Sequence, residues 1–326
     1  MVTKIKHIAG FFKLIRLPNL IMVAATFYLM RYCIVFPMLN NFGFEPRMGN
    51  FDFFLLAFSI ISLTAGGYVI NDYFDQKTDL INRPGTVIVG RHINRRWAMA
   101  FHIIFNSLAI LIGIYLSLKL NILYLSLLFI VGSGILWFYS TTYKKQLIIG
   151  NLIVSFSTAM VPMMVLLFEL PLLSREYGNL LDGMGFNVYH MAGWIIGFAL
   201  FAFIISLIRE IVKDTEDFEG DRAYGMQTLP IVAGIKWTKL VIFTLMTVFA
   251  GGLIYIYVSH LTYPVCLIYI VVFQLIPLTL TMFLLYRANS KKAYHHISLI
   301  LKFMMATGIF FAFVARHLIV HQYLIF

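Results

Sequence analysis

The sequence predicts an all-α membrane protein with nine transmembrane helices, organised as a single domain over residues 1–326. Hydrophobic residues make up 61% of the 326 positions, whereas charged residues make up only 12%. Soluble domains carry about 25% charged and about 45–50% apolar residues, so water is not the main solvent of this chain. The apolar residues are also gathered into segments of the length that crosses a bilayer as a helix, roughly 20 residues.

Nine such segments follow one another along the chain. They cover residues 18–38, 52–70, 97–118, 121–139, 149–169, 190–208, 238–259, 263–286 and 297–319. The basic N-terminus leads into the first of them, so we expect a retained first helix and not a cleaved signal peptide. The pairs Gly66-Gly67 and Gly251-Gly252 lie inside spans, where small residues allow helices to pack closely.

Basic residues predict the orientation of the spans. Most of the 25 Lys and Arg residues fall in the N-terminal stretch and in every second loop. Because such residues gather on the cytoplasmic side, the N-terminus is expected inside and the C-terminus outside. The net charge of +11 is then an attraction to anionic lipid of the bilayer, and no nucleic-acid partner is expected.

Two Asp-rich segments follow the second and the sixth span. One reads NDYFDQKTD at 71–79 and the other DTEDFEGD at 214–221. Their aspartates share the spacing i, i+3, i+7, which places three carboxylates on one face of a helix. They are Asp72, Asp75 and Asp79 in the first segment and Asp214, Asp217 and Asp221 in the second.

Rows of like charge destabilise a helix, so a matched pair of rows indicates a bound cation. The offset of four spans suggests an internal repeat that brings both rows to one cavity. Mg²⁺ is the expected cofactor, since it binds through a few carboxylates together with substrate phosphates. Asn71 precedes Asp75 by four residues and can add an amide oxygen to the six aspartates.

Basic residues beside both rows favour a metal–diphosphate complex. The candidates for binding the diphosphate are Lys77, Arg83, Lys144, Lys145, Lys213 and Arg222. A prenyl diphosphate has a charged head and an apolar tail, which suits a site at the cytoplasmic end of a helix bundle. Departure of the diphosphate leaves positive charge on the allylic carbon, which aromatic faces such as Tyr68 and Tyr139 can stabilise. Most aromatic side chains at this depth are nevertheless typical of an interfacial belt.

At these residues the sequence resembles the UbiA superfamily of intramembrane prenyltransferases. The resemblance rests on both Asp-rich motifs, on the RxxGxxTLP continuation from Arg222 to Pro230, and on Tyr139 followed by Lys144. Arg16 and Asn19 are similar to the opening of the family's first helix. The resemblance implies nine helices around a central cavity, with Mg²⁺ joining both motifs to the diphosphate. Asp75, Asp79, Asp217 and Asp221 are then the expected catalytic residues.

Within the superfamily, the motifs most resemble the branch of digeranylgeranylglyceryl phosphate synthases and their bacterial relatives. That resemblance implies transfer of a geranylgeranyl group to a membrane-soluble acceptor such as geranylgeranylglycerol phosphate, in a prokaryotic plasma membrane. Many relatives read RPxRPxxxG after the first motif, whereas this chain reads RPGTVIVGR at 83–91. Arg91 can replace the missing contact to an anionic acceptor, or it can face lipid.

Three other functions remain open on the sequence. An aromatic acceptor would make the protein a prenyltransferase of quinone synthesis. A terpene cyclase or diphosphatase would differ only in what captures the cation. A transporter would place ionisable residues deep in the spans, whereas only a few, such as Arg31, Lys302 and Arg316, lie there. Neither His92 nor Glu210, the nearest candidates, is an obvious general base.

Overall fold

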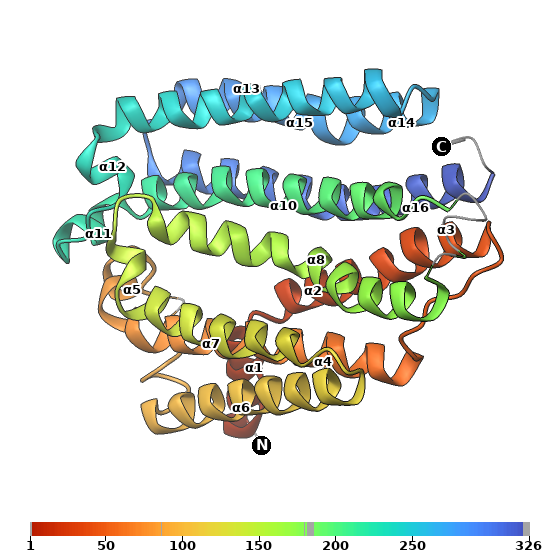
Figure 1. The fold of residues 1–326 in the computed structure, drawn as a ribbon. Helices are drawn as coiled ribbons and strands as arrows, with labels where there is room; N and C mark the ends of the chain where they lie inside the picture. The colour runs from red at the N-terminus through yellow and green to blue at the C-terminus, as the bar shows by residue number, and fades with distance from the viewer. Residues whose placement is uncertain (1, 86, 179, 181–185, 322–326) are drawn as a thin grey trace. The chain divides into compact units, whose positions relative to one another are not determined.

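The computed structural model describes residues 2–85, 87–178, 180 and 186–321. These residues form helices and turns, with one isolated bridge between Val89 and Ile93 and no longer strand among them. Nine helices of the described chain are long and apolar enough to cross a membrane (Figure 1). They span Leu17–Asn40, Asn50–Phe74, Arg95–Lys119, Leu123–Thr141, Ile149–Tyr177, Val188–Glu216, Gly234–His260, Pro264–Arg287 and Lys291–Val320. The predicted fold class is confirmed.

Several spans are built from more than one helical segment. The first comprises α2 (Leu17–Leu29), a π-helical turn (Met30–Val35) and α3 (Phe36–Asn40), and the eighth comprises α14 (Pro264–Ile270), a π-helical turn (Val271–Leu275) and α15 (Ile276–Arg287). The others are α4 (Asn50–Phe74), α6 (Arg95–Lys119), α7 (Ser126–Thr141), α8 (Ile149–Tyr177), α10 (Val188–Glu216), α13 (Gly234–His260) and α16 (Lys291–Val320). Short helices lie outside the spans: α1 (Val2–Leu14), α5 (Gln76–Asn82), α11 (Phe218–Ala223) and α12 (Leu229–Val232).

The chain divides into two compact units. The first comprises 1–27, 46–144 and 167–178, and the second comprises 28–45, 145–166 and 179–326. The first Asp-rich motif belongs to the first unit and the second motif to the second unit. The organisation as one functional domain remains a prediction.

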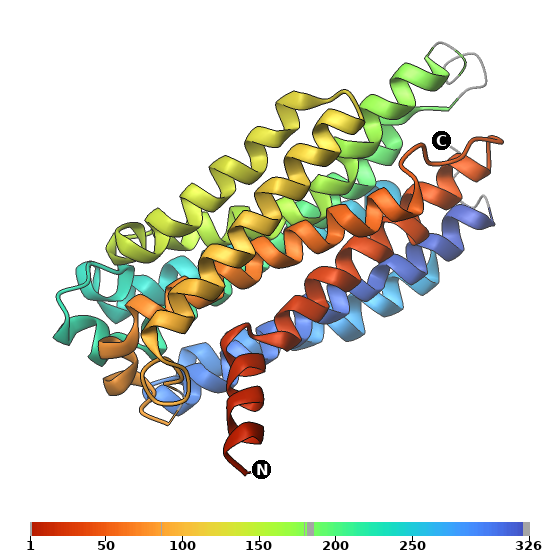
Figure 2. The same cartoon turned by 90° about the horizontal axis from the view of Figure 1, so that it is seen from below.

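In the first unit, α4 packs along α6 and α7. Close approach depends on glycine, because a Cβ on Gly66 would lie 2.5 Å from Asn106 Nδ2. Asn106 also accepts a hydrogen bond from Ser133 Oγ at 2.7 Å, which ties α6 to α7. Figure 2 shows α1 at a steep angle to α2, and Arg16 between these helices has a φ of 51°. Such a left-handed backbone is uncommon for a residue other than glycine.

In the second unit, α10 packs along α16 and α13 (Figure 1). Buried apolar side chains from these three helices form its core, among them Ile205, Met246 and Leu301. The expected close packing at Gly251-Gly252 is wrong, because a Cβ on either residue would meet no atom of the described chain within 4 Å. Close packing occurs instead at Gly308 of α16, which lies against the ring of Phe201.

Candidate active site

The first Asp-rich motif is shared between two helices. Asp72 lies in the last turn of α4, Asp75 lies at the junction with φ −84° and ψ 0°, and Asp79 lies in the first turn of α5. Backbone hydrogen bonds from Asp75 N to Asn71 O (3.0 Å) and from Asp79 N to Asp75 O (2.8 Å) continue across the junction. The motif therefore keeps helical spacing while the helix axis changes at Asp75.

The second motif repeats this arrangement. Asp214 lies in the last turn of α10, Asp217 lies at the junction with φ −93° and ψ 10°, and α11 carries Asp221. The bonds from Asp217 N to Lys213 O (2.8 Å) and from Asp221 N to Asp217 O (3.1 Å) again cross the junction. Two expectations are thus corrected. Each motif begins inside its span, and its row is divided at the middle aspartate and not carried by one helix.

Arg16 organises the side chains around the first motif. Its Nη2 donates a hydrogen bond to Asp72 Oδ1 at 2.8 Å, and its guanidinium lies 4.9 Å from the centre of the Tyr68 ring. Asn19 Nδ2 donates to the Tyr68 hydroxyl at 3.4 Å. The structure therefore brings together four predicted residues that are up to 56 positions apart in the sequence.

Two further charged contacts lie at the first motif. Lys144 Nζ forms an ion pair with Asp75 Oδ1, and the Lys144 side chain is largely buried. Burial raises the pKa of the Asp79 carboxyl to about 6, and the negative charges of Asp75 and Asp72 add to this rise. The positive charge of Arg83 opposes it. Mutual repulsion of the carboxylates is the condition under which a cation binds strongly.

The first aspartate of the second motif contacts a residue that was not identified from the sequence. Asn151 Nδ2, in the first turn of α8, donates a hydrogen bond to Asp214 Oδ2 at 2.8 Å. Asn151 is itself buried, with 6% of its surface exposed. The sequence does contain a clue to this contact, because Asn151 is an amide near the start of an otherwise apolar span. A polar side chain buried there needs a hydrogen-bond partner.

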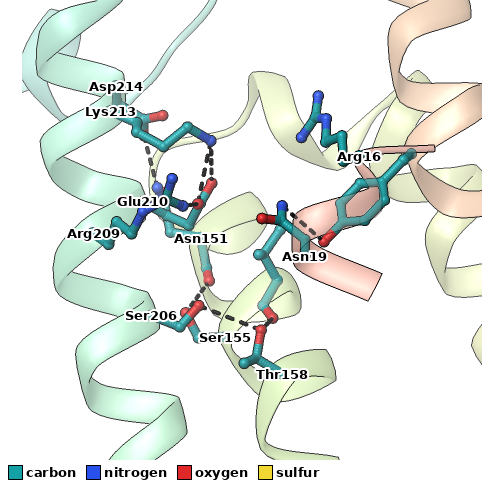
Figure 3. Close-up of polar contacts among 12 residues, drawn as sticks. Arg16, Asn19, Asn151, Ser155, Thr158, Ser206, Arg209, Glu210, Lys213 and Asp214 are labelled. Carbon is teal, nitrogen blue, oxygen red and sulfur yellow. Dashed lines mark hydrogen bonds and ion pairs between the residues drawn. The ribbon is translucent and has the colours of Figure 1, made fainter. Parts of the chain in front are cut away.

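Glu210 lies one turn before Asp214 and is held by two cations (Figure 3). Lys213 Nζ lies 3.0 Å from Glu210 Oε2, and Arg209 Nη1 lies 3.1 Å from Glu210 Oε1. Both oxygens of the Glu210 carboxylate therefore accept hydrogen bonds from cationic side chains of its own helix. Its contacts therefore argue against Glu210 as a general base.

The remaining predicted residues differ in their exposure. Asp221 is buried, but its neighbour Arg222 is exposed. Arg91 is exposed and donates to the carbonyl of Pro84 at 2.6 Å, within its own loop. Lys77 and Lys145 are exposed, whereas Arg83 and Tyr139 are half-buried. Of these residues, Arg83 acts on a motif aspartate through its charge, which lowers the pKa of Asp79.

The residues of the motifs fit a magnesium ion. Among the described residues, no three His, Cys, Asp or Glu side chains converge as a ready-made metal cage. Mg²⁺ does not require one, because it is usually held by one or two carboxylates, waters and substrate phosphates. Asn71 Oδ1 is buried without a hydrogen-bond partner. A buried acceptor without a donor costs free energy, and a hard cation would satisfy it.

Comparison with known sequences identifies related proteins. Digeranylgeranylglyceryl phosphate synthase of Methanothermobacter thermautotrophicus is 39% identical over 58% of this chain and 59% of its own length. The enzyme of that name from Thermococcus sibiricus is 34% identical over 60% of this chain and 63% of its own length. Both alignments therefore span less than two thirds of the relative. That of Methanosphaera stadtmanae is 30% identical over 82% of this chain and 87% of its own length.

Solved structures share the fold. A structure concerning digeranylgeranylglyceryl phosphate synthase in membranes aligns with a TM-score of 0.60 at 26% identity, over 95% of this chain and 98% of the other. A UbiA homologue from Archaeoglobus fulgidus bound to GPP and Mg²⁺ aligns with a TM-score of 0.56 at 14% identity, over 94% and 99%. The family model of the UbiA prenyltransferase family matches residues 21–315. This chain is an integral, multi-pass membrane protein that belongs to the UbiA prenyltransferase family.

Proposed function

We propose that this protein transfers a prenyl group, in particular geranylgeranyl, from a prenyl diphosphate to a lipid acceptor such as geranylgeranylglycerol phosphate. The observation that carries the proposal is the matched geometry of two Asp-rich motifs, each with its first aspartate held by a residue at the start of another helix. Membership of the UbiA family supports the reaction type. Relatives named digeranylgeranylglyceryl phosphate synthase support the choice of acceptor.

Both motifs supply oxygen ligands in this proposal. The ligands are Asn71, Asp72, Asp75, Asp79, Asp214, Asp217 and Asp221. When bound, Mg²⁺ neutralises the diphosphate and makes it a better leaving group. Support comes from the buried Asn71 oxygen and from the raised pKa of Asp79, which both favour a cation. The Mg²⁺ bound in the Archaeoglobus homologue is consistent with this assignment.

Basic side chains bind the diphosphate oxygens in this proposal. They are Lys77, Arg83, Lys144, Lys145, Lys213 and Arg222. Lys144 and Lys213 already contact carboxylates at their own motif. Lys144 could exchange its contact with Asp75 for a phosphate oxygen if Asp75 held the metal, and charge would then stay balanced as substrate binds.

Aromatic faces stabilise the developing allylic cation. Tyr68 already has a guanidinium over its ring at 4.9 Å, which supports its capacity to bind positive charge. Arg16 and Asn19 position this ring through their contacts with its face and its hydroxyl. Tyr139 is the second aromatic candidate, and Arg91 is the candidate contact to an anionic acceptor.

The site opens to the cytoplasm of a prokaryotic cell in this proposal, with the N-terminus inside and the C-terminus outside. The distribution of Lys and Arg supports that orientation. The family match over residues 21–315 includes parts of both compact units. This supports one functional domain over residues 1–326.

An assay with purified protein, labelled geranylgeranyl diphosphate and a panel of acceptors tests the proposal. We expect Mg²⁺-dependent product with geranylgeranylglycerol phosphate. Product only with a hydroxybenzoate, homogentisate or dihydroxynaphthoate would assign the quinone branch instead. Release of diphosphate without any acceptor would indicate a cyclase or a diphosphatase.

A further inference from the structure

A cavity of about 240 Å³ lies in the second unit, at the start of α16. Its lining consists of Glu216 from the end of α10 and of Lys291, Lys292, His295 and His296 from the first two turns of α16. Figure 1 shows the two helices side by side. Four of the five lining side chains are therefore basic.

These basic residues occupy an unfavourable place on their helix. The N-terminus of a helix carries partial positive charge, which destabilises cations in the first turn. Lys291 and Lys292 lie in that turn of α16, and the turn contains no acidic residue. A bound anion would offset both lysines and the helix dipole at once.

Glu216 does not cancel this positive charge. It is buried, with 7% of its surface exposed, and Oε1 lies 3.1 Å from Nδ1 of His295. Counted without the imidazoles, the two lysines exceed the single carboxylate by one positive charge. His296 and the exposed edge of His295 add hydrogen-bond donors at the mouth of the cavity.

We propose that this cavity binds the phosphate ester of a membrane lipid. The lysine ammonium groups bind phosphate oxygens as point charges, and the imidazole N–H groups can donate to the remaining oxygens. The cavity lies where a span begins, so a lipid can place its headgroup there and its chains along the apolar surface of α16. The source is either the phosphate-bearing acceptor, in which case the inference rests on the proposed function, or a phospholipid of the bilayer.

Binding is tested without catalysis. The purified full chain in uncharged detergent is titrated with short-chain phosphatidic acid, with diacylglycerol of the same chain length and with inorganic phosphate, and complexes are measured by native mass spectrometry. We expect phosphatidic acid to bind, diacylglycerol not to bind, and inorganic phosphate to compete. Lys292→Gln should weaken phosphatidic acid binding about tenfold, as expected for one charge-assisted contact. His296→Gln should weaken it in the same direction.

Lys236→Gln is the matched control. Lys236 is exposed in the first turn of α13, where it has the same charge and helix position but does not line the cavity. Its substitution should leave binding unchanged. The proposal is overturned if Lys292→Gln and Lys236→Gln weaken phosphatidic acid binding equally, because binding would then depend only on general positive charge. It is also overturned if neither Lys292→Gln nor His296→Gln weakens binding.

Kinetics then distinguish the two sources. A raised KM for geranylgeranylglycerol phosphate in Lys292→Gln, with kcat unchanged, would assign the site to the acceptor. An unchanged KM together with weakened phosphatidic acid binding would assign it to a bilayer lipid. If the wild-type protein transfers no prenyl group, the proposed function fails while the titration still decides the binding site.

Discussion

Asn151 donates a hydrogen bond to Asp214 at 2.8 Å, as Arg16 does to Asp72 at the same distance. In each unit, a polar residue at the start of one span holds the first aspartate of a motif carried by the next span. The start of the first span and the second span thus correspond to the start of the fifth span and the sixth span. This shared design is physical evidence for the internal repeat that the spacing of the motifs suggested.

Asn151→Leu removes the donor but keeps a similar volume. We expect kcat/KM for prenyl transfer to fall about 10- to 100-fold, the usual effect of removing a group that orients a metal ligand. Ser157→Ala is the control on the same helix, because the Ser157 hydroxyl donates only to Ile153 O in the described contacts. Steady-state kinetics at varied Mg²⁺ measure the effect. A wild-type rate and Mg²⁺ requirement in Asn151→Leu would contradict an orienting role.

Asp75→Ala and Asp217→Ala remove the aspartates at the two helix junctions. We expect both variants to lose transfer while remaining folded in detergent, since these carboxylates are proposed metal ligands. Size-exclusion profiles and circular dichroism check the fold, and product formation checks activity. Asp75→Ala also leaves Lys144 without its carboxylate partner, so the thermal midpoint of Asp75→Ala/Lys144→Ala shows whether the uncompensated lysine lowers stability. Normal Mg²⁺-dependent turnover in either single variant would remove the proposed site.

Much of this arrangement was predictable, because a helix that crosses a membrane needs a long run of apolar residues that is visible in the sequence. The span count and the positions of the motifs follow from long apolar runs and from acidic residues at their ends. The extension of α10 to Glu216 was not predictable from hydropathy, because backbone hydrogen bonds continue where apolar side chains stop. The pairing of Asn151 with Asp214 joins residues 63 positions apart and depends on how α8 packs against α10, which a single sequence does not specify.

Asp79 predicts a pH dependence of metal binding. Its pKa is raised to about 6 by burial and by the charges of Asp75 and Asp72. A raised carboxyl pKa means that the metal-free protein holds a proton on Asp79 below about pH 6, and Mg²⁺ must displace it. Mg²⁺ affinity should therefore weaken as the pH falls from 7.5 to 5.5.

The affinity is measured as the Mg²⁺ concentration that gives half of the thermal stabilisation at each pH. Asp79→Asn cannot take up this proton, so its weaker affinity should vary less over the same range. Without metal, the free energy of unfolding depends on pH in the opposite direction. The charged form of Asp79 is disfavoured in the folded state, so the contribution of Asp79 to stability decreases as the pH rises through 6. An Mg²⁺ affinity that is equally pH-dependent in Asp79→Asn would exclude Asp79 as the titrating group.

Alanine substitutions at Gly308 and Gly251 should have different effects on thermal stability. A Cβ on Gly308 would lie 2.1 Å from Cε1 of Phe201, whereas a Cβ on Gly251 would meet no described atom within 4 Å. Overpacking of this kind costs about 1–3 kcal/mol. Phe201 lies on α10, the helix that also carries Asp214. Gly308→Ala should therefore lower the midpoint of thermal unfolding. Gly251→Ala should leave it unchanged or raise it, since alanine favours a helix over glycine.

The clash itself can be isolated with a second substitution. Phe201→Leu removes the ring that the new methyl group meets, so Gly308→Ala/Phe201→Leu should be more stable than the sum of the two single changes predicts. Simple additivity would contradict a direct clash. If the clash displaces α10, any loss of Mg²⁺ affinity in Gly308→Ala should recover in the double variant together with stability.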